Sequence, residues 1–311
     1  MVKDTLLLFA GLLLLFSSGK YLVDSSVAIA RLFRIPTMVI GLTVVAFGTS
    51  APELLVSLQA AIRGFPEIAM GNVVGSNISN ILLVLAITAM IFPVAVPEKS
   101  VRRDWPMMML GSVLLFVFVL DGTLSRLEGM GFLLLLTGYI VYSVIQTRIA
   151  NSQTDEPEAV SSMKWWIAAA VFLVSCAGLA FGADLLVRGA ASIAGELGIS
   201  QRAISVTMVA VGTSIPELVT SVIAALKKES GISLGNILGS NIMNIISVLG
   251  ITSVITPIGV EREIALFDIP WMLGTSVLLL LLMLPAARSR ITRWEGIIMV
   301  FIYLLYIYLI F

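Results

Sequence analysis

Long apolar stretches, separated by short polar segments, follow one another along the whole chain. We place ten of them at residues 5–32, 37–63, 67–91, 105–121, 128–148, 165–195, 202–226, 231–257, 267–286 and 295–311. Their lengths match the roughly 20 residues that a helix needs to cross the hydrocarbon core of a bilayer. Apolar positions are continuous rather than alternating, so the pattern indicates helices and not strands of a barrel. The sequence therefore predicts an all-α integral membrane protein with ten transmembrane helices.

The longest polar interruption lies in the middle of the chain, at residues 151–163, and contains Asp155, Glu156 and Glu158. We interpret it as a short linker between an N-terminal unit of five helices, 1–150, and a C-terminal unit of five helices, 164–311. The first apolar stretch follows Lys3 and resembles a secretory signal peptide. It has a counterpart in the second unit, so we expect it to be retained as the first helix.

The two units repeat each other in sequence. Residues 40–81 share 22 of 42 positions with residues 204–245 in an alignment without gaps, in which Glu53 corresponds to Glu217. Five spans are an odd number, so the second copy must enter the membrane from the opposite side. The chain is therefore predicted to form two inverted five-helix repeats, related by a pseudo-two-fold axis in the membrane plane, which suits alternating access.

The basic residues of the loops predict an orientation. If the N-terminus lies outside, twelve Lys and Arg residues fall in inside loops and six in outside positions. Loops on the cytoplasmic side of membrane proteins are enriched in these residues. We therefore expect a multi-pass protein of the cell membrane with both termini extracellular.

Composition narrows the chemistry that this chain can perform. Hydrophobic residues make up 59% of it and charged residues 12%, and its 19 basic and 19 acidic residues cancel, which leaves no electrostatic footprint for nucleic acid. Histidine is absent and Cys176 is the one cysteine, so common ligands of transition metals are missing. A bound cation must be held by oxygen, as Na⁺, Ca²⁺ or Mg²⁺ would be. No cofactor and no protein partner is implied.

Each unit carries a polar segment inside its second apolar stretch. The two segments are Gly48-Thr49-Ser50-Ala51-Pro52-Glu53-Leu54 and Gly212-Thr213-Ser214-Ile215-Pro216-Glu217-Leu218. Glu53 and Glu217 should lie near mid-membrane, where a charge costs at least about 2.5 kcal/mol unless it is compensated. A bound cation would compensate both carboxylates.

The prolines and hydroxyls of these segments would add further oxygens. Proline interrupts a helix, and a broken helix can offer backbone carbonyls to an ion, here those of Ala46 and Ala210. Thr49 and Ser50 lie three to four residues before Glu53, so we expect them to share its helical face. Thr213 and Ser214 have the same relation to Glu217.

An ion pair could instead neutralise the two glutamates. Lys20 and Arg188 are the basic residues far enough inside a predicted span to do so. Each has an acid four residues away on its own helix, Asp24 and Asp184 respectively, which we expect to be its partner. The glutamates are then left for a cation.

A second polar segment follows in each unit. The two copies are Gly71-Asn72-Val73-Val74-Gly75-Ser76-Asn77-Ile78-Ser79-Asn80 and Gly235-Asn236-Ile237-Leu238-Gly239-Ser240-Asn241-Ile242-Met243-Asn244. Ser76 and Asn80 are four apart and share a face, as do Ser240 and Asn244. The glycines form stripes of small residues that favour close helix packing. The remaining asparagines fit packing or helix-bridging hydrogen bonds better than coordination.

These paired segments resemble the alpha repeats of the sodium/calcium exchanger family, within the wider calcium/cation antiporters. They have the form G-T-S-x-P-E followed by G-N-x-x-G-S-N-x-x-N, and the resemblance covers nearly the whole chain. It implies four clustered cation sites between helices 2, 3, 7 and 8, with Glu53 and Glu217 as shared ligands. It places around them the hydroxyls of Thr49, Ser50, Ser76, Thr213, Ser214 and Ser240 and the carbonyls of Ala46 and Ala210.

The resemblance implies exchange of Na⁺ for Ca²⁺, typically three Na⁺ for one Ca²⁺, with helices 1 and 6 long, tilted and mobile. Relatives often carry an aspartate where this chain has Asn244, including the potassium-dependent branch. Asn80 and Asn244 are both neutral here, which leaves a site of formal charge −2 and argues against potassium coupling.

We therefore expect a secondary active antiporter of Na⁺ and Ca²⁺ in a lipid bilayer. The alternative is a Ca²⁺/H⁺ antiporter of the same fold, since glutamates can carry protons, although proton-coupled relatives usually have a different motif with histidine or extra acids. An enzyme is disfavoured, because no nucleophile–base pair and no zinc-ligand set is visible. A channel is disfavoured by the inverted repeat.

Overall fold

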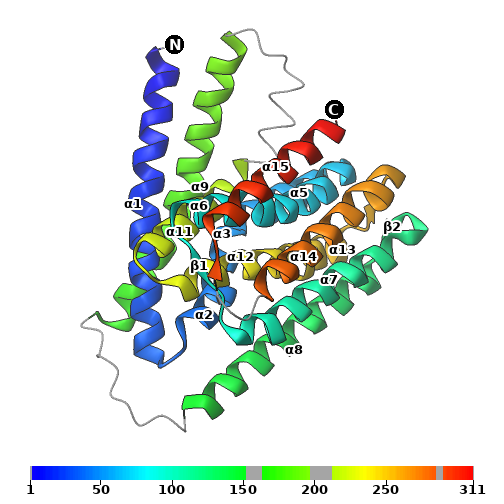
Figure 1. Cartoon of the computed structure of the whole chain (residues 1–311). Coiled ribbons are helices and arrows are strands. Elements are labelled where there is room, and N and C mark those ends of the chain that lie inside the picture. Colours follow the sequence, from blue (N-terminus) through cyan, green and yellow to red (C-terminus); the bar gives the residue numbers. More distant parts are fainter. Residues whose placement is uncertain (1, 152–162, 197–211, 285–289, 311) are drawn as a thin grey trace.

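The computed structural model describes residues 2–151, 163–196, 212–284 and 290–310, and most of them are helical (Figure 1). Seven of the described helices are long and apolar enough to cross a membrane, or eight if a bent pair, Thr37–Thr49 with Ala51–Ile62, forms one span. The predicted stretch at 202–226 is described from residue 212 onward. The prediction of a helical, multi-pass membrane fold is confirmed.

The described elements follow the predicted stretches closely. In the first unit they are α1 (Val2–Phe33), α2 (Thr37–Ile40), η1 (Gly41–Val45), α3 (Ala46–Thr49), α4 (Ala51–Ile62), α5 (Pro66–Ser79), η2 (Asn80–Leu85), α6 (Ala86–Ile91), β1 (Val94–Ala95), η3 (Ser100–Asp104), α7 (Trp105–Phe118), η4 (Val119–Asp121), β2 (Thr123–Leu124) and α8 (Arg126–Asn151). In the second unit they are α9 (Trp165–Glu196), α11 (Ile215–Leu226), α12 (Ser230–Ile242), η5 (Met243–Leu249), α13 (Gly250–Ile255), β3 (Ile258–Gly259), η6 (Ile264–Asp268), α14 (Ile269–Met283), β4 (Arg290–Ile291) and α15 (Arg293–Ile310).

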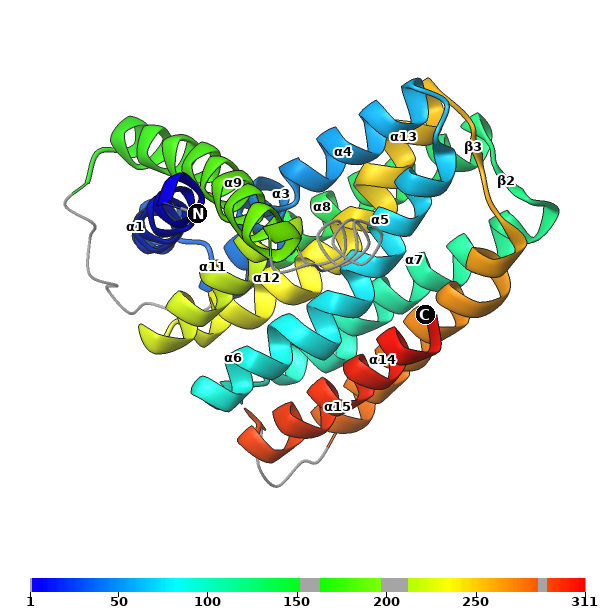
Figure 2. The same ribbon diagram turned by 90° about the horizontal axis from the view of Figure 1, so that it is seen from above.

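Helices α1 and α9 form a pair that stands at one side of the molecule (Figures 1 and 2). They pack against each other along their lengths. Glycine permits the contact: a Cβ added to Gly11 would lie 2.7 Å from the backbone nitrogen of Leu186, so only the bare backbone fits. This pair is the structural counterpart of the long first and sixth predicted helices.

The centre of the molecule is formed by α5, η2 and α6 from the first unit and by α12, η5 and α13 from the second, which cross beside each other in Figure 2. Gly235 and Gly239 of α12 pack against α2, η1 and α3, and a Cβ on them would lie 2.7 Å from the Met38 carbonyl and 2.5 Å from the Leu42 carbonyl. The predicted packing role of this stripe is confirmed. For the equivalent glycines of α5, no described atom lies within 4 Å of an added Cβ.

Local structure repeats along the chain together with the sequence. The π-helical segments η3 and η6 begin at equivalent positions of the two copies, and so do the strands β1 and β3. Further along, Ser125 and Glu128 cap α8 through a 2.7 Å hydrogen bond, and Thr292 and Glu295 cap α15 in the same way. The second cap falls three positions later than the same alignment predicts, so the second copy contains three additional residues before this point. The repeat therefore extends through the last helix of each unit.

The last helix of each unit packs against the other unit. α8 contacts α13, and α15 contacts α6. Arg126 at the start of α8 donates to the Ile255 carbonyl (3.3 Å), and Arg293 at the start of α15 donates to the Ile91 carbonyl (3.4 Å). The short strands also pair across the units, β1 with β4 and β2 with β3, both antiparallel. These reciprocal contacts hold the two copies together at two places.

One of the two expected intrahelical ion pairs is present. Arg188 and Asp184 are 2.8 Å apart. The predicted pair of Lys20 with Asp24 is wrong: the Asp24 carboxylate pairs with Lys227 at the end of α11, and the Lys20 ammonium lies 5.9 Å from the Tyr21 ring centre. The reason is tertiary, because α1 packs against α11 and brings Lys227 to Asp24.

Candidate cation-binding site

A break in the helix precedes each glutamate. The segment Thr37–Thr49 and α4 are bent by 44° relative to each other, and the residue between them, Ser50, has φ −84° and ψ 7°. Ser214 has nearly the same backbone, with φ −84° and ψ 0°, at the start of α11. Pro52 and Pro216 lie in the first turn of the helices that follow, where a missing N–H is tolerated. The predicted break at the proline segment is thus confirmed in the first copy.

The carbonyl of Ala46 is not left free by this break. It accepts the Ser50 N–H at 2.9 Å, so the expectation of a freed carbonyl at this position is wrong. The Thr49 hydroxyl oxygen lies 3.3 Å from the same carbonyl oxygen. The carbonyl that loses its helical donor is that of Gly48, because the donor four residues on would be Pro52. Ala46 retains a second lone pair that an ion could use. Ala210 lies outside the described residues.

Glu53 and Glu217 lie in the first turns of α4 and α11, and both are completely buried. The two carboxylates are close enough to repel each other. Neither carboxylate oxygen of Glu53 has a hydrogen-bond partner among the described residues, and the same holds for Oε2 of Glu217. Buried charges are normally paired or bind a metal, so these oxygens mark a place where a positive charge is needed.

The serine hydroxyls cross between the copies. Ser50 donates to Oε1 of Glu217 at 3.2 Å, and Ser240 donates to the same oxygen at 3.3 Å. The spacing predicts that Ser50 shares a helical face with Glu53. The helix instead breaks at Ser50, and the Ser50 hydroxyl bonds to the glutamate of the other copy. Ser214 is buried, and its hydroxyl has no hydrogen-bond partner within the described part of the chain.

The threonine hydroxyls also link the copies. Thr49 lies 3.4 Å from the Ser240 hydroxyl, and Thr213 lies 3.2 Å from the Ser76 hydroxyl. Each threonine is close to the glutamate of the opposite copy, Thr49 to Glu217 and Thr213 to Glu53. The structure thus brings both threonines to the carboxylates, and Ser76 to Thr213 beside them.

Asn80 and Asn244 are both completely buried at the start of the π-helical segments. The amide nitrogen of Asn244 donates to Oδ1 of Asn77 at 3.2 Å. Its oxygen, and both polar atoms of Asn80, have no hydrogen-bond partner among the residues that the structure describes. Unpaired amide oxygens are further candidates for cation ligation.

The helix-bridging hydrogen bonds expected as one possibility for Asn72 and Asn236 are present, and sequence reasoning missed their partners Ser57 and Ser221. Asn72 and Asn236 bond to the backbone of Glu53 and Glu217 and to the side chains of Ser57 and Ser221. A signal was available, since these residues are identical at equivalent positions of the two copies. Identity alone does not distinguish a bridging asparagine from a packing one.

The arrangement is an oxygen-only site with two carboxylates. Within the described residues there is no group of three or more His, Cys, Asp and Glu side chains that could hold a metal. A cation bound here would therefore combine two charges with neutral hydroxyl, amide and carbonyl oxygens, a ligand set that suits Na⁺ or Ca²⁺.

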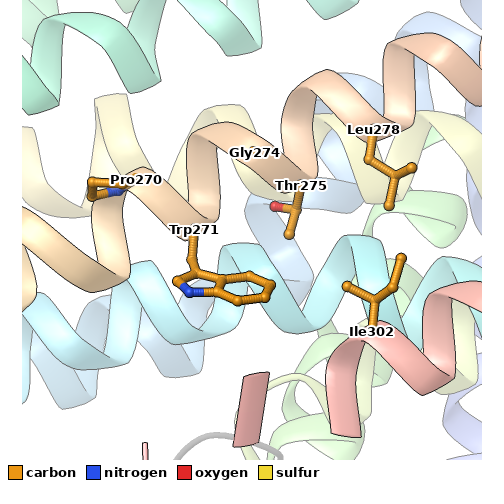
Figure 3. Close-up of a pocket in the computed structure, with 6 residues that line it drawn as sticks. All are labelled: Pro270, Trp271, Gly274, Thr275, Leu278 and Ile302. Carbon is orange, nitrogen blue, oxygen red and sulfur yellow. The ribbon is translucent and has the colours of Figure 1, made fainter. Parts of the chain in front are cut away.

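A separate cavity of about 310 Å³ lies against α14 and α15 (Figure 3). Its lining is largely apolar, and its one hydroxyl, that of Thr275, donates to the Met272 carbonyl at 2.8 Å. The lining residues are Pro270, Trp271, Gly274, Thr275, Leu278 and Ile302. With no carboxylate in its wall, this cavity does not offer a cation site.

Known proteins resemble this chain along nearly its whole length. The family model described as "Sodium/calcium exchanger protein" matches residues 3–148 and 167–311. The chain is 33% identical to sodium/calcium exchanger MaX1 of Methanosarcina acetivorans, over 98% of both chains, and 35% identical to inner membrane protein YrbG of Escherichia coli, over 91% of this chain and 89% of that one.

A solved structure of the sodium-calcium exchanger NCX_Mj, soaked with Na⁺ and Sr²⁺, superimposes with a TM-score of 0.83 at 33% identity and covers 99% of this chain and 98% of that one. The family model and the full-length relatives match nearly the whole sequence, including both polar segments of each unit. The chain therefore belongs to the sodium/calcium exchanger protein family.

Proposed function

We infer that this protein is a secondary active antiporter that exchanges Na⁺ for Ca²⁺ across a membrane by alternating access. The observation that carries the inference is the pair of completely buried carboxylates, Glu53 and Glu217, with three oxygens that have no hydrogen-bond partner among the described residues. Two such charges inside a bilayer are strongly unfavourable without compensation. One Ca²⁺ neutralises both charges, and Na⁺ ions can replace it.

The proposed ligands surround these carboxylates. Hydroxyl oxygens from both copies lie at or near them. Further hydroxyl and amide oxygens are buried without a partner among the described residues. The full proposed set is Glu53, Glu217, Thr49, Ser50, Thr213, Ser214, Ser76, Ser240, Asn80 and Asn244, with the carbonyls of Ala46 and Ala210. No resident cofactor is needed, because Na⁺ and Ca²⁺ are the cargo.

The proposed topology has ten transmembrane helices in two inverted repeats, 1–150 and 164–311, joined by a linker at 151–163. The strand pairs support it. β1 and β4 must lie on the same side of the membrane, as must β2 and β3. With ten spans, the loops that carry β1 and β4 lie on one side of the membrane, and the loops that carry β2 and β3 lie on the opposite side, as the pairing requires. We place both termini outside a cell membrane, from the excess of basic residues in the inside loops.

The test uses purified protein in sealed proteoliposomes. A Na⁺ gradient should drive uptake of radiolabelled Ca²⁺, and a pH gradient without Na⁺ should not. Empty liposomes and liposomes with Na⁺ equal on both sides are the controls. Uptake driven by the pH gradient and indifferent to Na⁺ would replace this proposal with Ca²⁺/H⁺ exchange, and uptake without any gradient coupling would indicate a channel.

A further inference from the structure

Two asparagines outside the proposed ligand set make the same three contacts in the two copies. Asn72 donates from its amide nitrogen to the Glu53 backbone carbonyl at 3.3 Å and to the Ser57 hydroxyl at 3.0 Å. Asn236 donates to the equivalent atoms of the second copy, the Glu217 carbonyl at 3.3 Å and the Ser221 hydroxyl at 3.0 Å. These bonds tie α5 to α4 and α12 to α11 at the turn that carries each glutamate.

The third contact of each asparagine reaches the opposite copy. The Thr213 hydroxyl donates to Oδ1 of Asn72 at 3.4 Å, and the Thr49 hydroxyl donates to Oδ1 of Asn236 at 3.0 Å. Asn72 is 2% exposed and Asn236 is 0% exposed, so water does not compete for these bonds. A bridge between two helices of one copy would not require the third contact.

The orientation of each amide is fixed by its partners. Both hydrogens of the amide nitrogen are used, and one of the acceptors is a carbonyl, which cannot donate. A flipped amide would place its oxygen against that carbonyl oxygen. Oδ1 must therefore face the threonine, where it can only accept. For Thr49 this contact, at 3.0 Å, is shorter than the alternative to the Ala46 carbonyl at 3.3 Å, so it is the better position for the single hydroxyl hydrogen. With its hydrogen on Oδ1, the threonine would present its oxygen, and not its hydrogen, toward the glutamate of the other copy.

We propose that Asn72 and Asn236 are positioning residues for cation binding, each of which aligns the glutamate of its own copy and the threonine hydroxyl of the opposite copy. Neither touches the ion. The proposal rests on the cation-binding function inferred above. At metal sites, hydrogen bonds to the ligands hold those ligands in the right orientation, and loss of such a bond weakens metal binding. The two asparagines would have this role here.

A double-mutant cycle tests the proposal in the full-length protein. Ca²⁺ affinity is measured by titration calorimetry for wild type, Asn236→Ala, Thr49→Ala and the double variant. We expect Asn236→Ala to weaken binding about tenfold, within the range found for supporting residues of metal sites. Asn236 acts partly through Thr49. The loss of Ca²⁺ affinity in the double variant should therefore be smaller, by at least about threefold, than the product of the two single losses.

The matched control is Asn241→Ala on the same helix, α12. Asn241 is also buried, and its amide donates to the Ile237 carbonyl within its own helix at 2.8 Å. In the double variant of Asn241→Ala with Thr49→Ala, the loss of Ca²⁺ affinity should equal the product of the two single losses. If the losses for Asn236→Ala and Thr49→Ala also multiply in this way, the proposal is overturned.

The cycle of Asn72→Ala with Thr213→Ala runs the same test from the other copy. If neither asparagine variant folds, the residues are structural and the proposal is overturned. In transport, both variants should raise the KM for Ca²⁺ more than they lower the maximal rate. If the wild-type protein does not exchange Na⁺ for Ca²⁺, the proposed function itself is refuted. If the wild type exchanges these ions but the asparagine and threonine substitutions act independently, only the positioning role is refuted.

Discussion

Glu53 and Glu217 occupy equivalent positions of the two copies but have different surroundings. Oε1 of Glu217 accepts hydrogen bonds from Ser50 and Ser240, whereas neither oxygen of Glu53 has a described partner. The equivalent donor for Glu53 would be Ser214, whose hydroxyl is buried and has no partner among the described residues. At the scale of single residues, the repeat places like groups together without giving them identical bonds.

Removal of either carboxylate charge should abolish exchange. Glu53→Gln and Glu217→Gln keep the shape of the side chain but leave a single charge to face Ca²⁺. Because the number of charged ligands sets Ca²⁺ affinity over several orders of magnitude, we expect binding to weaken by at least about 100-fold. Calorimetry and Na⁺-driven Ca²⁺ uptake measure this. Near-wild-type exchange by correctly folded Glu217→Gln would show that the site is not shared between the copies.

Acid should weaken Ca²⁺ binding. Protons and cations compete for the same two carboxylates, and a protonated carboxyl group has lost the charge that attracts Ca²⁺. Affinity should therefore fall as the pH is lowered and recover fully as it is raised again. Titrations with Ca²⁺ from neutral to acidic pH give the measurement, with circular dichroism as the control for intact helices. An affinity that does not change with pH would contradict the involvement of two carboxylates.

At the scale of elements, the two copies differ in the charges that meet α1 and α9. Asp24 of α1 pairs with Lys227 at the end of α11. The equivalent positions hold Arg188 of α9 and Arg63 at the end of α4, which carry the same charge. In the structure α1 packs on α11. In the inverted arrangement α9 would pack on α4 instead, and Arg188 and Arg63 would then lie close together and repel each other. The ion pair therefore favours the arrangement of the structure over the inverted alternative.

Breaking this pair should shift the position of α1 with little effect on stability. The pair is partly exposed, with 29% and 46% of the two side chains accessible, so its loss should cost no more than about 1 kcal/mol of unfolding free energy. After Cys176→Ala, spin labels on α1 and α11 report the distance between them. In Lys227→Ala, the distribution of this distance should broaden toward longer values. In the charge-reversed double variant, Asp24→Lys with Lys227→Asp, the original distribution should return.

A matched control for this experiment is available on the same chain. Arg102→Ala breaks the ion pair of Arg102 with Glu98, 2.7 Å apart and highly exposed, which joins neighbouring turns and no distant helices. It should leave the α1–α11 distance unchanged. An unchanged distance in Lys227→Ala as well would show that the pair does not bias the arrangement.

At the scale of the whole molecule, the reciprocal contacts between the copies separate two groups of helices. α8 lies on α13, α15 lies on α6, and the short strands pair across the copies, whereas α1 and α9 pack mainly on each other (Figure 2). The first group forms a scaffold held from both copies, and we expect the second, the α1–α9 pair, to move against it as a unit. This division suits a site that opens alternately to either side.

Transport should be independent of K⁺ and should carry net charge. Asn244 supplies no carboxylate for an additional monovalent ion. One Ca²⁺ against three Na⁺ moves one positive charge per cycle, worth about 2.3 kcal/mol per 100 mV. Na⁺-driven Ca²⁺ flux is measured in proteoliposomes at imposed voltages set without a K⁺ ionophore, with and without added K⁺. A requirement for K⁺ would contradict the interpretation of Asn244, and a flux indifferent to voltage would contradict the three-to-one coupling.

The sequence by itself determined the helical, multi-pass membrane fold and the sequence repeat, and it singled out the two glutamates as candidates. These follow from composition and from residues close together in the chain: a helix in lipid must be continuously apolar, so Glu53, Glu217 and the prolines before them stand out against their own stretches. The break at Ser50 was predictable for the same reason, because the constraint of Pro52 is local.

Only the tertiary structure decided which groups meet across the copies. Helical spacing relates Ser50 to Glu53 and Lys20 to Asp24, yet Ser50 bonds to Glu217 and Asp24 pairs with Lys227. Periodicity reports neighbours three and four residues apart on one helix. The bonds of the site instead depend on how α4, α5, α11 and α12 pack, which is set by side-chain volumes and close backbone contacts distributed over both copies.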